Sequence, residues 1–226
     1  MKPRTREIQA YLGSENDADR VAAFYATDQS GFLLPRTIQE IARALEARTT
    51  FLGVHGSEVV AVASSFEPVW PYIELGGSLV APTYRGFGLQ RLMFAARFAN
   101  VLLNQGPEVV ITTSIKENNP KSILNATKLG FETWAEPALE LLGSCGTCPK
   151  RNPTRCCATY YRIPRHKVAE AVSALLRATE AGPAVTIERG GDTLVVRLLV
   201  PAIMGRHRDG LREVVDAMLL EEGRTG

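Results

Sequence analysis

The stretch VAPTYRGFGLQ, residues 80–90, places two glycines two apart directly after an arginine. The apolar run before it predicts a strand, and the amphipathic run after it predicts a helix. A strand-to-helix junction of this kind presents free backbone N–H groups and a helix N-terminus, and both bind anions. Glycine lets a ligand approach the backbone closely, and the forked guanidinium of Arg85 suits a phosphate. The sequence therefore predicts a phosphate site at Gly86 and Gly88, with a plain tight turn as the alternative.

Four cysteines form the second group that could do chemistry: Cys145, Cys148, Cys156 and Cys157, with none elsewhere in the sequence. In a reducing compartment, such clustering indicates metal or redox chemistry rather than a disulfide framework. A Cys-x2-Cys pair followed by a second pair suits four thiolates around a tetrahedral Zn²⁺, with His166 as a replacement for one of them. We expect a structural zinc knuckle at residues 145–157; redox thiols, buried free cysteines and, last, an iron–sulfur cluster are the alternatives.

The hydrophobic pattern predicts the elements that position these residues. Strands are expected at 6–12, 49–54, 58–66, 72–80, 108–115, 131–142 and 156–163. Helices are expected at 15–27, from the capping box at 37–40 onward, at 89–104 and at 120–129. After Pro164 the pattern changes to a helix at 166–179, a Gly-Gly hairpin at 185–200 and a helix at 208–220. We therefore expect an α/β fold with one domain at 1–164 and a C-terminal α-β-β-α extension at 165–226.

The glycine segment resembles motif A of the GNAT superfamily of N-acetyltransferases, which binds the pyrophosphate of coenzyme A. Arg85 and Gly88 match this motif, whereas Gln90 stands where a small residue is usual. Gln90 either crowds the first helical turn or points its side chain outward. The stretch NPKSILNATKLGF, which runs from Asn119 to Phe131, is similar to the family's motif B. Four residues fill the motif B positions: Asn119, Ser122, Gly130 and Phe131.

The order of elements over 6–163 also agrees with the GNAT fold, a mixed central sheet flanked by helices. The resemblance implies that acetyl-CoA or another acyl-CoA is the cosubstrate. It also implies the residues that bind it: Leu79, Val80, Arg85, Gly86, Phe87, Gly88, Leu89, Gln90, Asn119 and Ser122.

Acyl transfer from a thioester to an amine needs a neutral amine and a polarised carbonyl group. By resemblance, the carbonyl lies at the backbone of Leu79 and Val80. Glu74 lies six residues before Val80 and, by the strand period of two, on the same face. We expect Glu74 to accept the ammonium proton as general base. Substrate binding, or pairing with an arginine, is the alternative role.

The tyrosine that usually protonates the leaving thiolate in motif B is replaced by Ala126. Three interpretations remain open. The thiolate leaves unassisted, because a thiol pKa near 8.5 is close to neutral; another phenol substitutes; or the transferase activity is lost. The candidate phenols are Tyr84, Tyr160 and Tyr161.

Composition limits the classes of function. The 226 residues are 45% apolar and 22% charged, which is typical of a globular protein with a sizeable core. A net charge of +2 is too small to indicate a nucleic-acid or membrane partner. The start of the chain has no apolar segment of signal-peptide length, so we expect a cytoplasmic protein.

The leading hypothesis is an acyl-CoA-dependent N-acyltransferase that acts on an amine-bearing small molecule or protein by direct attack in a ternary complex. The alternative is a non-catalytic GNAT-like module for ligand binding or protein interaction, organised by the zinc knuckle. The strands of the extension are expected either to lengthen the sheet or to pair across a homodimer, because hairpins seldom stand alone.

Overall fold

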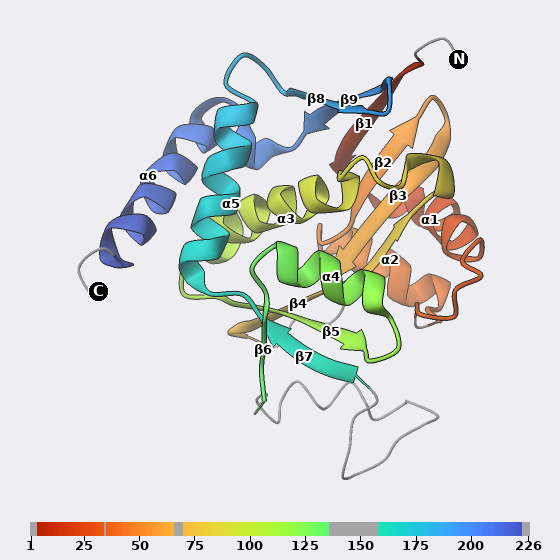
Figure 1. Ribbon diagram of the computed structural model, residues 1–226, viewed down its shortest axis with the longest axis horizontal. Helices are drawn as coiled ribbons and strands as arrows, with labels where there is room; N and C mark the ends of the chain where they lie inside the picture. Colours follow the sequence, from red (N-terminus) through yellow and green to blue (C-terminus); the bar gives the residue numbers. More distant parts are fainter. Residues whose placement is uncertain (1–3, 34, 66–69, 136–157, 223–226) are drawn as a thin grey trace.

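The computed structural model describes residues 4–33, 35–65, 70–135 and 158–222 (Figure 1). Its strands form a 9-stranded sheet in the order β6-β7-β5-β4-β3-β2-β1-β9-β8. The strands are β1 (Thr5–Leu12), β2 (Phe51–His55), β3 (Glu58–Ser65), β4 (Tyr72–Val80), β5 (Val110–Lys116), β6 (Glu132–Thr133), β7 (Ala158–Arg162), β8 (Ala184–Arg189) and β9 (Asp192–Leu199). The helices are α1 (Ala18–Tyr25), α2 (Ile38–Glu46), α3 (Leu89–Gln105), α4 (Pro120–Lys128), α5 (Arg165–Ala178) and α6 (Gly205–Glu222).

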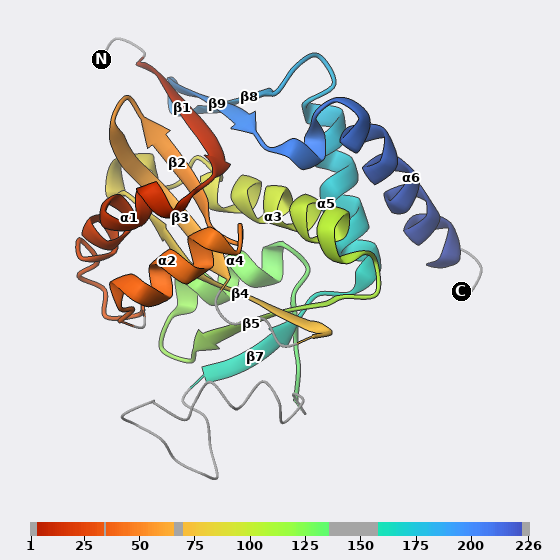
Figure 2. The same ribbon diagram turned by 180° about the vertical axis from the view of Figure 1, so that it is seen from behind.

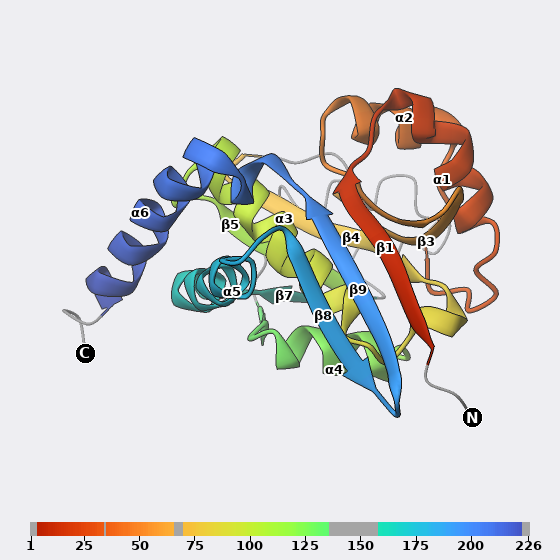
Figure 3. The same ribbon diagram turned by 90° about the horizontal axis from the view of Figure 1, so that it is seen from above.

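Helices cover the two faces of this sheet unequally. Helices α1 and α2 pack on one face, where Val21, Phe24, Ile41 and Leu45 form a small apolar core with residues of β2, β3 and β4. Helices α3, α4, α5 and α6 contribute to the larger core on the other face, together with alternate residues of β1 and β9. Seen from behind and from above, α1 and α2 lie on the opposite side of the sheet from α3 and α5 (Figures 2 and 3).

Strands β4 and β5 run parallel but stay together only briefly. Their register pairs are Tyr72↔Val110, Ile73↔Ile111 and Glu74↔Thr112. Beyond Glu74, β4 remains paired with β3 as far as Val80, while β5 remains paired with β7 as far as Lys116. The sheet therefore opens between the carboxyl ends of β4 and β5, which leaves backbone groups on both strands without a partner strand.

Local sequence accounts for several element boundaries. Helix α2 begins with a capping box, in which Glu40 N donates to Thr37 Oγ1 over 3.2 Å and Thr37 N donates to Glu40 Oε2 over 2.7 Å. Helix α4 has Pro120 at its first position, which needs no N–H partner. Gly130, with φ of +93°, follows its end in a conformation that suits glycine.

Most of the expected elements are present, with differences at their ends. The helix expected at 15–27 is a 3₁₀ turn, Glu15–Asp17, followed by α1. Of the strand expected at 131–142, the structure shows only β6: residues 131, 134 and 135 are not in a strand, and residues 136–142 lie outside the described ranges. No helix in the described part of the chain is long and apolar enough to cross a membrane.

The C-terminal residues lengthen the sheet, which was one of the two expected roles of the hairpin. Strand β9 runs parallel to β1 from Thr5↔Thr193 to Tyr11↔Leu199, and β8 pairs with the far side of β9. Helix α5 packs on α3, and α6 packs on α5. The division into a domain at 1–164 and an extension at 165–226 stays a prediction, as does a homodimer.

Candidate functional site

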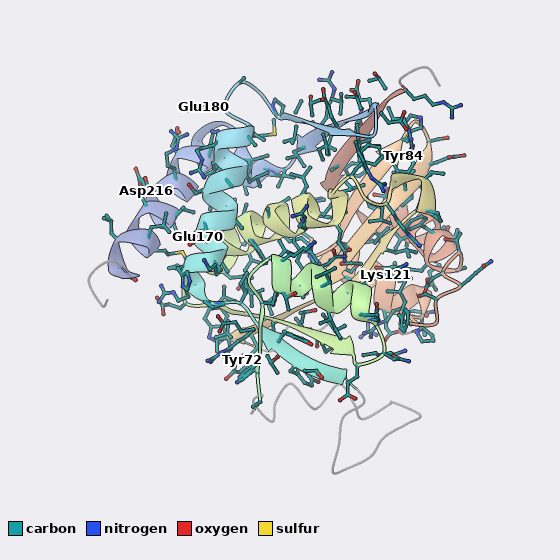
Figure 4. The ribbon with its side chains drawn as sticks, in the orientation of Figure 1. Tyr72, Tyr84, Lys121, Glu170, Glu180 and Asp216 are labelled. Atoms are coloured by element: carbon teal, nitrogen blue, oxygen red, sulfur yellow. The ribbon has the colours of Figure 1, made fainter. Side chains whose placement is uncertain are left out.

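The glycine segment forms the junction between β4 and α3 that the sequence predicts. A 3₁₀ turn, Pro82–Tyr84, follows β4, and α3 begins at Leu89 (Figure 4). Phe87 and Leu89 are buried and fix the loop in the larger core. The intervening Gly86 and Gly88 have φ of +85° and +79°, which an L-residue adopts only at a cost. Neither glycine covers its own backbone with a side chain, which suits an anion site at the N-terminus of α3.

Two arginines lie at this loop. Arg85 Nε donates to Val80 O over 2.8 Å, so its side chain folds back over the end of β4. The guanidinium of Arg91 lies over Gly88, where Nη2 would be 3.5 Å from an added Cβ. Both cations would therefore lie near an anion bound to the exposed N–H groups of the loop.

One amide of β4 faces the opening between β4 and β5. Ala81 N donates to Val60 O over 2.8 Å, so Ala81 faces β3. By the alternation of an antiparallel pair, Val80 directs its N–H and C=O away from β3, toward the opening. The bond from Arg85 to Val80 O agrees with this direction. Val80 N–H is thus a donor at the position expected for the acyl carbonyl group, whereas Leu79 has its side chain in the smaller core.

A β-bulge interrupts β4 between Glu74 and Val80. Val62 pairs with Leu79 and Ser64 pairs with Gly76, so β4 has one more residue than β3 over this interval. Gly77, with φ of +53°, lies within the bulge. Because of the extra residue, side chains after the bulge point to the opposite face from the one that a regular strand would give them. Leu75 accordingly belongs to the larger core and Leu79 to the smaller one.

The expectation that Glu74 and Val80 share a face is therefore wrong. Val80 packs against the larger core, while Glu74, which alternates with the buried Ile73 and Leu75, faces the side of α1 and α2. Residues six apart share a face only in a regular strand, and the bulge interrupts β4 between these two residues. The two glycines at 76–77 were the signal for a bulge.

Glu74 lies in a polar row that crosses three strands. Its carboxylate accepts a hydrogen bond from Ser114 Oγ on β5. Ser114 is the register partner of Tyr160 on β7, so both side chains are on the same face of the sheet. Tyr160 is 5% exposed. The row therefore places one carboxylate, one hydroxyl group and one phenol on one face of the sheet. On the same face, α1 and α2 pack over neighbouring strands.

A tyrosine on α1 holds the bulge from that same face. Tyr25 Oη donates to Gly77 O over 2.6 Å and lies 2.9 Å from Ser64 Oγ. Burial raises the pKa of Tyr25 to about 12, so the phenol keeps its proton at neutral pH. The bulge therefore has a neutral donor that fixes its carbonyl group.

The most buried charged group of the described residues is Arg97, in the middle of α3. Its Nη2 donates to Ser64 O, and its Nη1 has no hydrogen-bond partner in the described chain. Burial lowers the pKa of the Arg97 guanidinium to about 9. The cation therefore lies beneath the end of β3, and no carboxylate of the described residues forms an ion pair with it.

The motif B residues cap α4 and lie next to the loop. Asn119 Oδ1 accepts from Ser122 N over 3.2 Å, so this asparagine is the N-cap of α4. Gln90 Oε1 accepts from Asn125 Nδ2 over 2.9 Å. The side chain of Gln90 thus joins the first turn of α3 to α4.

Position 126, where the resemblance leads us to expect a tyrosine, lies in the interior of the protein. Ala126 is 3% exposed and lies in the larger core. Of the candidate phenols, Tyr161 also lies in that core, and Tyr84 lies on the glycine loop, where burial raises its pKa. Neither Tyr84 nor Tyr161 has a described contact with Glu74 or Ser114. Tyr160 lies closest to them in the sheet.

The expected metal ligands, Cys145, Cys148, Cys156 and Cys157, lie outside the described residues. Within the described ranges, no group of three or more His, Cys, Asp or Glu residues is arranged to bind a metal ion.

Sequence reasoning missed several residues of this region. Tyr25 and Ser114 are ordinary members of a helix and a strand, and no motif marks them. Arg97 interrupts the apolar side of α3, which is a visible signal, since an arginine is seldom fully buried.

Comparison with solved structures identifies the fold. No protein-family profile and no curated protein sequence matches the chain. The diaminobutyrate acetyltransferase of Paenibacillus lautus, solved with L-2,4-diaminobutyric acid and coenzyme A, matches with a TM-score of 0.51 and 16% identity over 71% of this chain and 96% of that one. A spermidine N-acetyltransferase chimera of Vibrio cholerae and hSSAT matches with a TM-score of 0.51 and 12% identity over 71% and 97%. The chain therefore has the GNAT acetyltransferase fold, as the sequence resemblance implied.

Proposed function

We propose that this protein is an acyl-CoA-dependent N-acyltransferase that uses acetyl-CoA. The observation that carries the proposal is the opening between β4 and β5, which ends at a loop with two positive-φ glycines and the N-terminus of α3. The loop offers N–H donors and arginines to a pyrophosphate, and the opening offers Val80 N–H to a thioester carbonyl group. Both structural neighbours are named as acetyltransferases of amines.

In this proposal the amine attacks the thioester carbonyl carbon directly, the carbon–sulfur bond breaks, and the thiolate leaves. Val80 N–H stabilises the negative charge that develops on the carbonyl oxygen. Glu74 removes the proton of the incoming ammonium group, directly or through one water, and Ser114 holds its carboxylate in place. The thiolate takes its proton from solvent, because Ala126 supplies none.

The acceptor in this proposal is an amine-bearing small molecule or a protein amine. It approaches from the face of α1 and α2, where the polar row of Glu74, Ser114 and Tyr160 lies. Diaminobutyric acid and spermidine, named for the two neighbours, are the first acceptors to try.

The test combines binding and turnover. Native mass spectrometry with acetyl-CoA is expected to show a 1:1 adduct, and a panel of amines is expected to yield free coenzyme A. Glu74→Gln should lower turnover about 10²- to 10⁴-fold and leave the adduct intact. Glu132→Gln, which neutralises an exposed carboxylate on β6, is the matched control. A wild-type protein that forms no adduct would refute the proposal.

A second candidate is a non-catalytic module of the same fold, and the buried Ala126 in place of a phenol favours it. In this case the coenzyme binds without turnover on any amine, and Glu74→Gln changes nothing that can be measured. We further propose that Cys145, Cys148, Cys156 and Cys157 bind a structural zinc ion. Mass spectra with and without a strong chelator test this directly, since loss of a zinc-sized mass is expected.

A further inference from the structure

The C-terminal hairpin places an arginine against the glycine loop. Arg189 is the last residue of β8, just before the Gly190–Gly191 turn, and it is exposed. Its Nη1 donates to Arg85 O over 2.7 Å. A Cβ added at Gly86 would lie 2.1 Å from Nη1 and 2.3 Å from Cζ of Arg189. The guanidinium therefore occupies the space that any side chain at position 86 would fill.

Separate contacts hold the hairpin in this position. Asp192, the register partner of Arg189, accepts from Arg6 Nη2 and from Arg4 N, each over 3.2 Å. Arg6 Nη1 donates to Thr83 O over 2.6 Å, three residues before Gly86. Arg6 thus joins the tip of the hairpin to the loop, and Arg189 is positioned before any ligand arrives. Such preorganisation lowers the cost of binding.

The charges at the loop are unbalanced. Arg6 has a carboxylate partner in Asp192, but Arg85, Arg91 and Arg189 have none within the described residues. Three guanidinium groups around two bare glycines repel one another in the free protein, and an anion at the loop would relieve this repulsion. The hydrogen bond to Arg85 O uses one N–H of Arg189, so Nε and Nη2 remain as donors.

We propose that Arg189 binds a phosphate group of coenzyme A that lies on the glycine loop. This inference rests on the proposed function and adds to it a ligand from the C-terminal hairpin, 104 residues from Arg85 in the sequence. A guanidinium binds phosphate oxygens in a forked geometry with charge-assisted hydrogen bonds. The pyrophosphate and the 3′-phosphate of the coenzyme share this chemistry, so each is a candidate ligand.

The experiment measures dissociation constants by titration calorimetry for coenzyme A and for dephospho-coenzyme A, which lacks the 3′-phosphate. The variants are Arg189→Gln and Arg189→Lys. Arg197→Gln is the matched control, because it removes an exposed arginine of the same hairpin that pairs with Glu7. Arg197 lies opposite Ala184, five residues from Arg189 along β8, or about 17 Å. Thermal unfolding of each variant checks that it is folded.

Arg189→Gln is expected to weaken coenzyme A binding about tenfold or more, and the difference from wild type should narrow at higher salt. Arg189→Lys should lose less, since lysine keeps the charge without the fork. An equal loss with dephospho-coenzyme A assigns Arg189 to the pyrophosphate, and a loss seen only with coenzyme A assigns it to the 3′-phosphate. Arg197→Gln should bind like wild type.

A wild type that binds coenzyme A, together with a folded Arg189→Gln that binds both ligands within twofold of wild type, overturns this inference alone. A wild type that binds neither ligand overturns the proposed function and this inference with it.

Discussion

Replacing Gly86 by alanine should destabilise the free protein by two separable effects. At a φ of +85°, an L-residue costs about 1–2 kcal/mol in backbone strain. The new Cβ also displaces the guanidinium of Arg189 and breaks its hydrogen bond to Arg85 O, which is worth about 1 kcal/mol. The total is about 2–3 kcal/mol. For a chain of this size, this corresponds to a lowering of Tm by roughly 4–12 °C.

Gly88→Ala provides the matched comparison. Its φ is +79°, so the strain is similar, but an added Cβ would meet Arg91 Nη2 only at an ordinary 3.5 Å. Gly86→Ala should therefore cost about 1 kcal/mol more than Gly88→Ala in wild type. In an Arg189→Ala background the two should cost the same, because there is no guanidinium to displace.

Urea unfolding of wild type, the three single variants and the two double variants, without ligand, measures these differences. Contacting residues show non-additive effects, whereas independent sites add within about 0.3–0.5 kcal/mol. If Gly86→Ala costs the same with and without the Arg189 side chain, the hairpin does not lie against the loop and the reasoning is wrong.

Two further predictions concern the buried polar groups. The pKa of Tyr25 is raised to about 12, so the stability that its protonated hydroxyl contributes is complete below pH 10 and is lost as the pH rises toward 12. The difference in urea midpoint between wild type and Tyr25→Phe should therefore shrink between pH 10 and pH 12. A difference that stays constant over this interval would contradict the prediction. Arg97→Met should change the free energy of unfolding by less than about 1 kcal/mol, because the loss of a hydrogen bond to Ser64 O is offset by removal of a buried charge with an unsatisfied Nη1. Arg97→Ala should lower the free energy of unfolding by at least about 3 kcal/mol, because it leaves a cavity. If urea unfolding shows the same loss for Arg97→Met and Arg97→Ala, the charge itself is needed for stability.

Features encoded within a few residues could be predicted from the sequence. The glycine loop, the capping box of α2 and the Gly190–Gly191 turn each depend on neighbours in the chain, and each is present. The fold followed from the order of such elements together with two motifs. Local chemistry was sufficient because the conformation of each of these features is set by residues that are adjacent in the chain.

Features that depend on distant residues could not be predicted. The position of Arg189 at Gly86 is set by the pairing of β9 with β1, which no local pattern encodes. The partner of Glu74 comes from β5 and required the register of that strand. The facing of Glu74 was misjudged for a different reason, since one extra residue in β4 reverses every side chain beyond it.

The pairing of β1 with β9 has a consequence for how the protein is made. Glu7 and Arg197 form an ion pair 190 residues apart, so β1 lacks its neighbour β9 on that edge until residues 192–199 have left the ribosome. Contacts this distant in sequence form late and slow folding. In the interval, an unpaired strand edge and the uncovered side of α3 are exposed to other chains. A version that ends near residue 164 would keep both surfaces open permanently, and we expect it to aggregate during expression while the full chain remains in solution.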